Sequence, residues 1–133
     1  MILLDTHVLL WVVSGSDRLG KRARKRIELE FGEGRVAVSA MTYWEIAMLA
    51  SRKRIEMEQS SAEFRRIVIN LGVPEIAVSG DVGSVAGELD SFHGDPADRI
   101  LVATALAHEA GFVTADERIL AWKSSLPRID ARR

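Results

Sequence analysis

Short apolar runs alternate with longer helix-like segments along the chain, and this alternation limits the fold more than any other feature. Five runs are predicted as strands, at residues 1–4, 36–38, 75–78, 112–114 and, more weakly, 128–129. Strands that alternate with helices favour a parallel sheet covered by helices on both faces. The sequence therefore predicts an α/β fold, a three-layer α/β/α sandwich around a mainly parallel sheet of four to five strands.

Capping residues and glycines mark where the intervening helices begin and end. We expect helices from just after Asp5 to residues 14–16, from Asp17 to about Phe31, after Ser39 up to residues 52–54, from Ser60 or Ser61 to residues 71–72, and over residues 82–89, 96–110 and 117–122. No linker, repeat or low-complexity segment interrupts this series. We therefore expect residues 1–133 to form a single domain, a usual size for one hydrophobic core.

Composition narrows the class of protein. With 47% hydrophobic and 28% charged residues, the chain is typical of a globular protein, and the absence of cysteine excludes disulfides, thiolate zinc sites and cysteine nucleophiles. No basic flank precedes the first apolar run, and Asp5 interrupts it, which argues against a signal peptide. No apolar stretch reaches the roughly 20 residues that span a bilayer. We expect a cytoplasmic protein without membrane contact.

The net charge of −1 conceals two basic clusters, at residues 21–26 and 52–54. The simplest interpretation is that both are solvated helix faces. The alternative is a path for a nucleic-acid backbone, since phosphates are held by lysine and arginine.

Two acidic residues lie in otherwise apolar surroundings. Asp5 is the only acidic residue of the opening stretch MILLDTHVLLWVV, where a buried carboxylate is costly without a compensating partner. Glu45 is the only charged residue from 40 to 50, and the helical period puts Met41, Met48 and Leu49 on its face. An exposed glutamate is the simpler interpretation of Glu45.

Three further aspartates can be explained as helix caps. Asp95 precedes Pro96, an arrangement typical of an N-cap followed by proline at the first helical position. Asp98 lies three residues on, in the first turn, where negative charge suits the helix dipole. Asp116 can likewise be explained either as a helix N-cap or as a functional residue.

Taken together, Asp5, Glu45, Asp98 and Asp116 indicate a site. In open parallel sheets, sites form beyond the carboxyl ends of the strands, so these side chains are expected to converge. Carboxylates gathered in a cleft repel one another unless some are protonated or a cation lies between them. Without cysteine or clustered histidine, oxygen ligands favour Mg²⁺ or Mn²⁺. Such an ion can activate water for phosphodiester cleavage, which predicts a nuclease.

Four blocks, LLDTHVLLW, SAMTYWEIA, HGDPADRILVATAL and FVTADERIL, resemble in order those of the PIN-domain ribonucleases, and within them the VapC-type toxins of toxin–antitoxin pairs. The resemblance implies a small α/β/α sandwich and metal-dependent RNA cleavage. It places Asp5, Glu45, Asp98 and Asp116 at the acidic metal-site positions.

The same resemblance suggests supporting residues. Asp95 matches an aspartate that is better explained as a helix cap than as a metal ligand. Thr6, Ser39 and Thr114 stand beside the carboxylates and could orient them or a water molecule. Arg99 is expected to contact a carboxylate or a substrate phosphate. We expect His7 to be packed or hydrogen-bonded, and we consider a proton-transfer role for His93.

The resemblance also implies a homodimer and a VapB-type antitoxin that blocks the site. Apolar residues around Leu9, Trp11, Trp44 and Met48 fit either partner contacts or core packing. The alternatives are a PIN nuclease of RNA processing that is not a toxin, a Mg²⁺-binding phospho-acceptor signalling domain, and a binding module whose carboxylates are only caps. A phospho-acceptor domain normally has paired acidic residues after its first strand and a lysine after a later strand, and the sequence lacks both.

Overall fold

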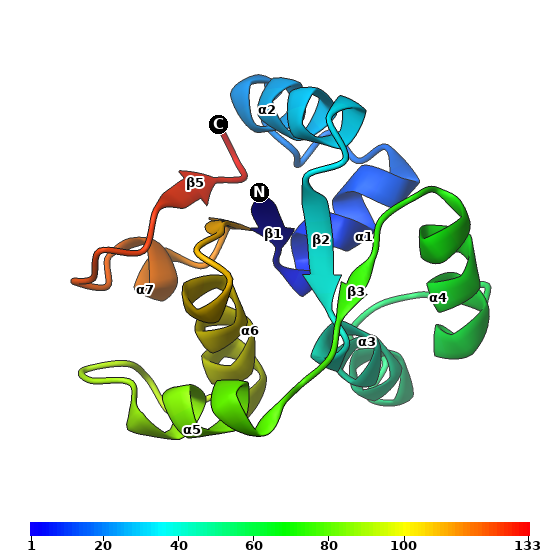
Figure 1. The fold of residues 1–133 in the computed structure, drawn as a ribbon. Coiled ribbons are helices and arrows are strands. Elements are labelled where there is room, and N and C mark those ends of the chain that lie inside the picture. The colour runs from blue at the N-terminus through cyan, green and yellow to red at the C-terminus, as the bar shows by residue number, and fades with distance from the viewer.

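The computed structural model describes residues 1–133 and contains one five-stranded parallel sheet (Figure 1). The strands are β1 (Ile2–Leu4), β2 (Val36–Ser39), β3 (Glu75–Ile76), β4 (Gly111–Thr114) and β5 (Arg128–Asp130). Their order is β3-β2-β1-β4-β5, and every neighbouring pair is parallel. The predicted α/β fold with a central parallel sheet is confirmed.

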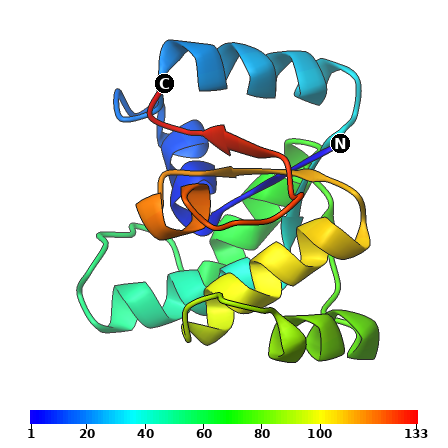
Figure 2. The same ribbon diagram turned by 90° about the vertical axis from the view of Figure 1, so that its left-hand side faces the viewer.

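Seven helices connect the strands and cover both faces of the sheet (Figure 2). They are α1 (Thr6–Ser14), α2 (Lys21–Gly32), α3 (Met41–Ser51), α4 (Ser61–Asn70), α5 (Gly80–Glu88), α6 (Pro96–Ala107) and α7 (Glu117–Leu120). None of them is long and apolar enough to cross a membrane.

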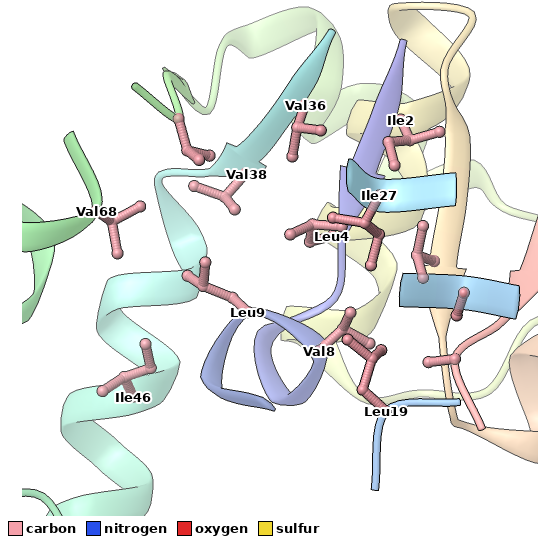
Figure 3. Close-up of a cluster of buried hydrophobic side chains, with 14 of the residues drawn as sticks. Ile2, Leu4, Val8, Leu9, Leu19, Ile27, Val36, Val38, Ile46 and Val68 are labelled. Atoms are coloured by element: carbon pink, nitrogen blue, oxygen red, sulfur yellow. The ribbon is translucent and has the colours of Figure 1, made fainter. Parts of the chain in front are cut away.

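The alternation of side chains along β1 and β2 divides the core into two layers, because successive strand residues point to opposite faces. Ile2, Leu4 and Val38 are buried in the larger layer, which α1, α2 and α4 complete (Figure 3). Leu3 and Phe112 point the other way and pack against α6. The buried residues thus form one layer on each face of the sheet, as the predicted three-layer α/β/α sandwich requires.

Several element boundaries differ from the prediction. Helix α2 begins at Lys21 instead of Asp17, because Gly20 is its extended N-cap residue and the chain first turns to bury Leu19. Strand β3 is only two residues long, since the backbone leaves the sheet before Ser79 caps α5. Helix α6 ends at Ala107, because Glu109 adopts a left-handed conformation (φ 51°) and leads directly into β4.

The strand order also separates this fold from the phospho-acceptor alternative. Receiver domains such as CheY have the order 2-1-3-4-5, with their site between the first and third strands. Here β1 lies between β2 and β4. Strands β2 and β3 extend the sheet on one side of β1, and β4 and β5 extend it on the other, so the order of the strands reverses between β1 and β4. The carboxyl ends of β1 and β4 are adjacent, and the Asp5 amide donates to the Val113 carbonyl at 2.9 Å.

Candidate metal centre

Asp5 leaves the end of β1 and forms the N-cap of α1. It is only 8% exposed. Two groups donate to its carboxylate, the Thr114 hydroxyl to Oδ2 at 2.6 Å and the Thr6 amide to Oδ1 at 2.8 Å. Burial raises the pKa of Asp5, and these two hydrogen bonds oppose the rise only in part. The two hydrogen bonds therefore reduce the free-energy cost of burying the Asp5 carboxylate but do not remove it.

Glu45 reaches the same place from the middle of α3. Its side chain is partly buried, and its Oε1 atom is fully buried without a hydrogen-bond partner. Burial raises the pKa of Glu45, the Thr6 hydroxyl lowers it, and the charges of Asp5 and Asp95 raise it further. A buried carboxylate oxygen without a partner is costly, which makes Glu45 a strong candidate for binding a group of positive charge.

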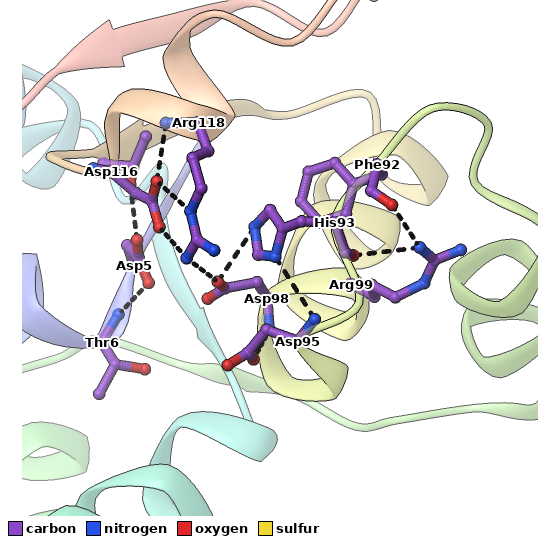
Figure 4. Close-up of polar contacts among 10 residues, drawn as sticks. Asp5, Thr6, Phe92, His93, Asp95, Asp98, Arg99, Asp116 and Arg118 are labelled. Atoms are coloured by element: carbon purple, nitrogen blue, oxygen red, sulfur yellow. Dashed lines mark hydrogen bonds and ion pairs between the residues drawn. The ribbon is translucent and has the colours of Figure 1, made fainter.

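Asp98 projects from the first turn of α6, where the Asp95 side chain caps the helix by accepting the Asp98 amide at 3.0 Å. Its side chain is 13% exposed, with His93 Nε2 at 3.3 Å and Arg118 Nη2 at 3.9 Å from Oδ2 (Figure 4). Burial, followed by the charges of Asp5 and other nearby carboxylates, raises the pKa of Asp98 to about 8. Near neutral pH this group therefore holds a proton unless a cation replaces it.

Asp116 follows β4 and caps the short helix α7. The Arg118 backbone amide donates to Oδ1 at 2.8 Å, and the Arg118 guanidinium donates to Oδ2 at 3.2 Å. Burial raises the pKa of Asp116, but the hydrogen bonds from Arg118 outweigh it and the net pKa is lowered. Asp116 therefore favours its charged form more strongly than a free aspartate does.

These four carboxylates line one cleft of about 400 Å³. Its other lining residues are His7, Trp11, Arg54, Asp95, Ala115 and Arg118. His93 does not line this cleft, but one ligand atom each of His93, Asp98 and Asp116 lie within 4.8 Å of one another, close enough to share one ion. Asp5 and Glu45 lie outside this tightest set but face the same space.

A hard divalent cation suits this donor set. The cleft offers several carboxylate oxygens and no thiolate, the combination that Mg²⁺ and Mn²⁺ prefer. The unpaired Glu45 oxygen and the raised pKa values of Asp5 and Asp98 indicate that the protein alone does not fully stabilise the charged forms of these carboxylates.

Arg118 was not foreseen from the sequence. Its guanidinium lies between Asp98 and Asp116 and provides the nearest positive charge to both. The available signal was its position two residues after Asp116, inside the first turn of a helix that Asp116 caps.

The supporting residues have more varied roles than the sequence suggested. Thr114 does contact Asp5, whereas the Ser39 hydroxyl accepts the Met41 amide at 3.1 Å and so caps the start of α3. The Thr6 hydroxyl lies 3.1 Å from that of Thr42. His7 was expected to be packed or hydrogen-bonded, but it is exposed at the edge of the cleft, because it lies on the outer face of α1.

Arg99 also differs from expectation, since its hydrogen bonds go to neither a carboxylate nor the open cleft. Its guanidinium turns away from Asp98 and donates only to backbone carbonyls of the last turn of α5 and of the segment that joins α5 to α6. The physical reason is that this segment folds back over the side of α6 and would otherwise leave its carbonyl oxygens unpaired.

The two basic clusters lie in different places. Arg54, just beyond the end of α3, lines the acidic cleft, as expected for a residue beside a bound phosphate backbone. Lys21, Arg22, Lys25 and Arg26 are exposed on α2 and do not line that cleft. For this cluster the simpler interpretation, a solvated helix face, fits the structure.

A five-stranded parallel sheet with an acidic cleft at the carboxyl ends of β1 and β4 is typical of one class of protein, and residues 2–123 match the sequence pattern of the PIN domain. The chain belongs to the PIN-domain family. It is 32% identical to Ribonuclease VapC22 of Mycobacterium tuberculosis over 127 residues, which cover 95% of each chain.

Solved structures with the same fold belong to toxin–antitoxin complexes. One is VapBC2 from Rickettsia felis bound to a DNA fragment from its promoter, with TM-score 0.67, 18% identity and 98% of each chain covered. Another is a toxin–antitoxin complex from Klebsiella pneumoniae, with TM-score 0.63, 21% identity and 95% of each chain covered. At these identities the likeness shows the fold.

Proposed function

We propose that this protein is a metal-dependent endoribonuclease and the toxin of a VapBC-type toxin–antitoxin pair. The observation that carries the proposal is the convergence of Asp5, Glu45, Asp98 and Asp116, from four different elements, on one cleft. The 32% identity to a protein named as a VapC ribonuclease supports RNA as the substrate class.

In this proposal Asp5, Glu45, Asp98 and Asp116 hold Mg²⁺ or Mn²⁺. The bound ion would stabilise charge on the phosphoryl oxygens and make a water molecule a better nucleophile. Thr114 and the Thr6 amide hold the Asp5 carboxylate at a fixed angle, and Arg54 at the edge of the cleft offers positive charge to the RNA backbone.

We further propose a homodimer and a VapB-type antitoxin as partners. The solved structures of similar fold are toxin–antitoxin complexes, and exposed apolar side chains such as Trp44, Ile69 and Leu71 offer contact surface. A PIN nuclease of RNA processing is the alternative, and it would share the chemistry but not the effect on growth.

The test is RNA cleavage by the purified protein. We expect cleavage with Mg²⁺ or Mn²⁺, loss of cleavage with a chelator, and loss in Asp5→Asn and Asp98→Asn. His108→Ala, which changes an exposed residue at the far end of α6, is the matched control and should cleave normally. Full activity in both asparagine variants would refute the metal site. Growth arrest on expression, relieved by the gene's immediate neighbour, would distinguish a toxin from a processing nuclease.

A further inference from the structure

The segment that joins α5 to α6 is held by Arg99 from the first turn of α6. The guanidinium donates at 2.9–3.3 Å to five backbone carbonyl oxygens, those of Ala86, Gly87, Leu89, Phe92 and His93. A guanidinium has five N–H groups in a rigid plane, and all three nitrogens of Arg99 are engaged, by the last turn of α5 and by this segment. Arg99 is thus committed to the shape of the segment and is not available to a substrate phosphate.

Aromatic packing orients the His93 ring within this segment. The Phe92 and His93 rings stack with centroids 4.5 Å apart, and Trp122 meets Phe92 edge-on at 5.0 Å. Trp122 also donates to the Asp90 carbonyl at 3.0 Å, which ties α7 to the same segment. The imidazole is therefore stacked on Phe92, and Trp122 in turn packs against Phe92.

The two ring nitrogens of His93 have different partners. Nδ1 accepts the Asp95 amide at 3.4 Å, and Nε2 lies 3.3 Å from Asp98 Oδ2 (Figure 4). A neutral imidazole carries one donor and one acceptor nitrogen, so an accepting Nδ1 leaves the proton on Nε2. This buried Nε2 makes no hydrogen bond in the structure, and the contact with Asp98 Oδ2 at 3.3 Å offers the acceptor that its N–H needs.

We propose that His93 is a positioning residue that donates from Nε2 to Oδ2 of Asp98, leaving Oδ1 for the cation, and that Arg99 holds His93 in this place. The proposal rests on the proposed metal site. Groups that hydrogen-bond to a metal ligand fix its orientation, and their loss typically weakens metal binding by about 10- to 100-fold. The competing assignment is His93 as a direct ligand, which the tautomer required by Asp95 opposes.

Binding of Mn²⁺ to the metal-free protein, measured by electron paramagnetic resonance without RNA, tests the role of His93. Glutamine can place an amide N–H where Nε2 lies, so His93→Gln should bind Mn²⁺ within about 3-fold of the wild type, whereas His93→Ala should bind at least about 10-fold more weakly. His108→Ala should bind as the wild type does. Pulsed measurements should show no directly coordinated imidazole nitrogen.

Three results would overturn the proposal: a coordinated nitrogen in the wild type, equal weakening in His93→Gln and His93→Ala, or normal binding in His93→Ala. A wild-type protein that binds no Mn²⁺ would instead overturn the proposed metal site itself, and this proposal with it. The two failures are therefore distinguishable.

A double-mutant cycle tests Arg99. Lysine keeps the charge but cannot reach five carbonyls, so Arg99→Lys should weaken Mn²⁺ binding in the wild type yet have little further effect in His93→Ala, because both changes remove the same interaction. Melting temperatures should fall equally in both backgrounds. If Arg99→Lys lowers the melting temperature but leaves Mn²⁺ affinity unchanged in the wild type, Arg99 is purely structural and the proposal is refuted.

Discussion

Removing the Asp98 carboxylate should stabilise the metal-free protein at pH 8. The perturbation is Asp98→Asn, which leaves a neutral side chain of the same shape. A rise in the pKa of Asp98 from 3.8 to about 8 corresponds to about 6 kcal/mol if each pKa unit is worth about 1.4 kcal/mol. Cleft water and the Arg118 guanidinium 3.9 Å away reduce this cost, so we expect about 2 kcal/mol.

The sign follows from proton binding. Between pH 4 and pH 8 the folded protein keeps a proton on Asp98 that the unfolded chain has lost, so its stability falls as the pH rises. Below about pH 4 both states hold the proton, and the contribution is fully present. Asparagine resembles the protonated form, so Asp98→Asn should match the wild type at about pH 3, where both the folded and the unfolded wild type hold the proton, and exceed it at pH 8.

The assay is thermal unfolding by calorimetry with a chelator present, at pH 3 and pH 8. For a chain of this length, about 2 kcal/mol corresponds to a rise in Tm of about 6 °C. Asp116→Asn is the matched control with the opposite sign, since Asp116 has a lowered pKa and stabilises the fold through Arg118. If Asp98→Asn is no more stable than the wild type at pH 8, or gains equally at pH 3, the reasoning about this carboxylate fails.

Three further predictions concern the cleft and the core. Thr114→Val removes the hydroxyl that donates to Asp5 at 2.6 Å and should cost about 1–3 kcal/mol in urea unfolding at pH 7; a variant as stable as the wild type would show that this hydrogen bond contributes little. Arg118→Gln removes the cation that Mn²⁺ must displace between Asp98 and Asp116, and it should raise Mn²⁺ affinity about 2- to 5-fold by titration calorimetry at low salt; weaker binding would mean that Arg118 assists the ion. Phe112→Ala creates a cavity in the fully buried layer against α6 and should cost about 3–5 kcal/mol in urea unfolding; a loss below about 1 kcal/mol would mean that the layer repacks around the gap.

The fold could be predicted because its signals are local. Ile2, Leu3 and Leu4 form an uninterrupted apolar run, and such runs are typical of strands buried on both faces of a parallel sheet. Strand β3 was overestimated because Val78 belongs to the same apolar run as Ile76, although it lies beyond the end of the pairing with β2. The apolar pattern of residues 75–78 does not indicate where the pairing with β2 ends.

The roles of Arg99 and His93 could not be predicted in the same way. Position in the chain places Arg99 beside Asp98, but the direction of its side chain depends on carbonyls up to 13 residues away. That return of the chain over α6 is a tertiary feature without a local signal. The same holds for Trp122, which reaches 32 residues back to Asp90.

The apolar opening stretch tolerates Asp5 because three of the four carboxylates of the proposed metal site are compensated, each by a different means. Asp5 receives two hydrogen bonds, Asp116 receives Arg118, and Asp98 keeps a proton, whereas one oxygen of Glu45 has no partner. A core built only for stability would replace such a group with apolar side chains at little cost. The protein instead keeps like charges close together and partly unpaired, a loss of stability that is expected where activity depends on a preformed cation site.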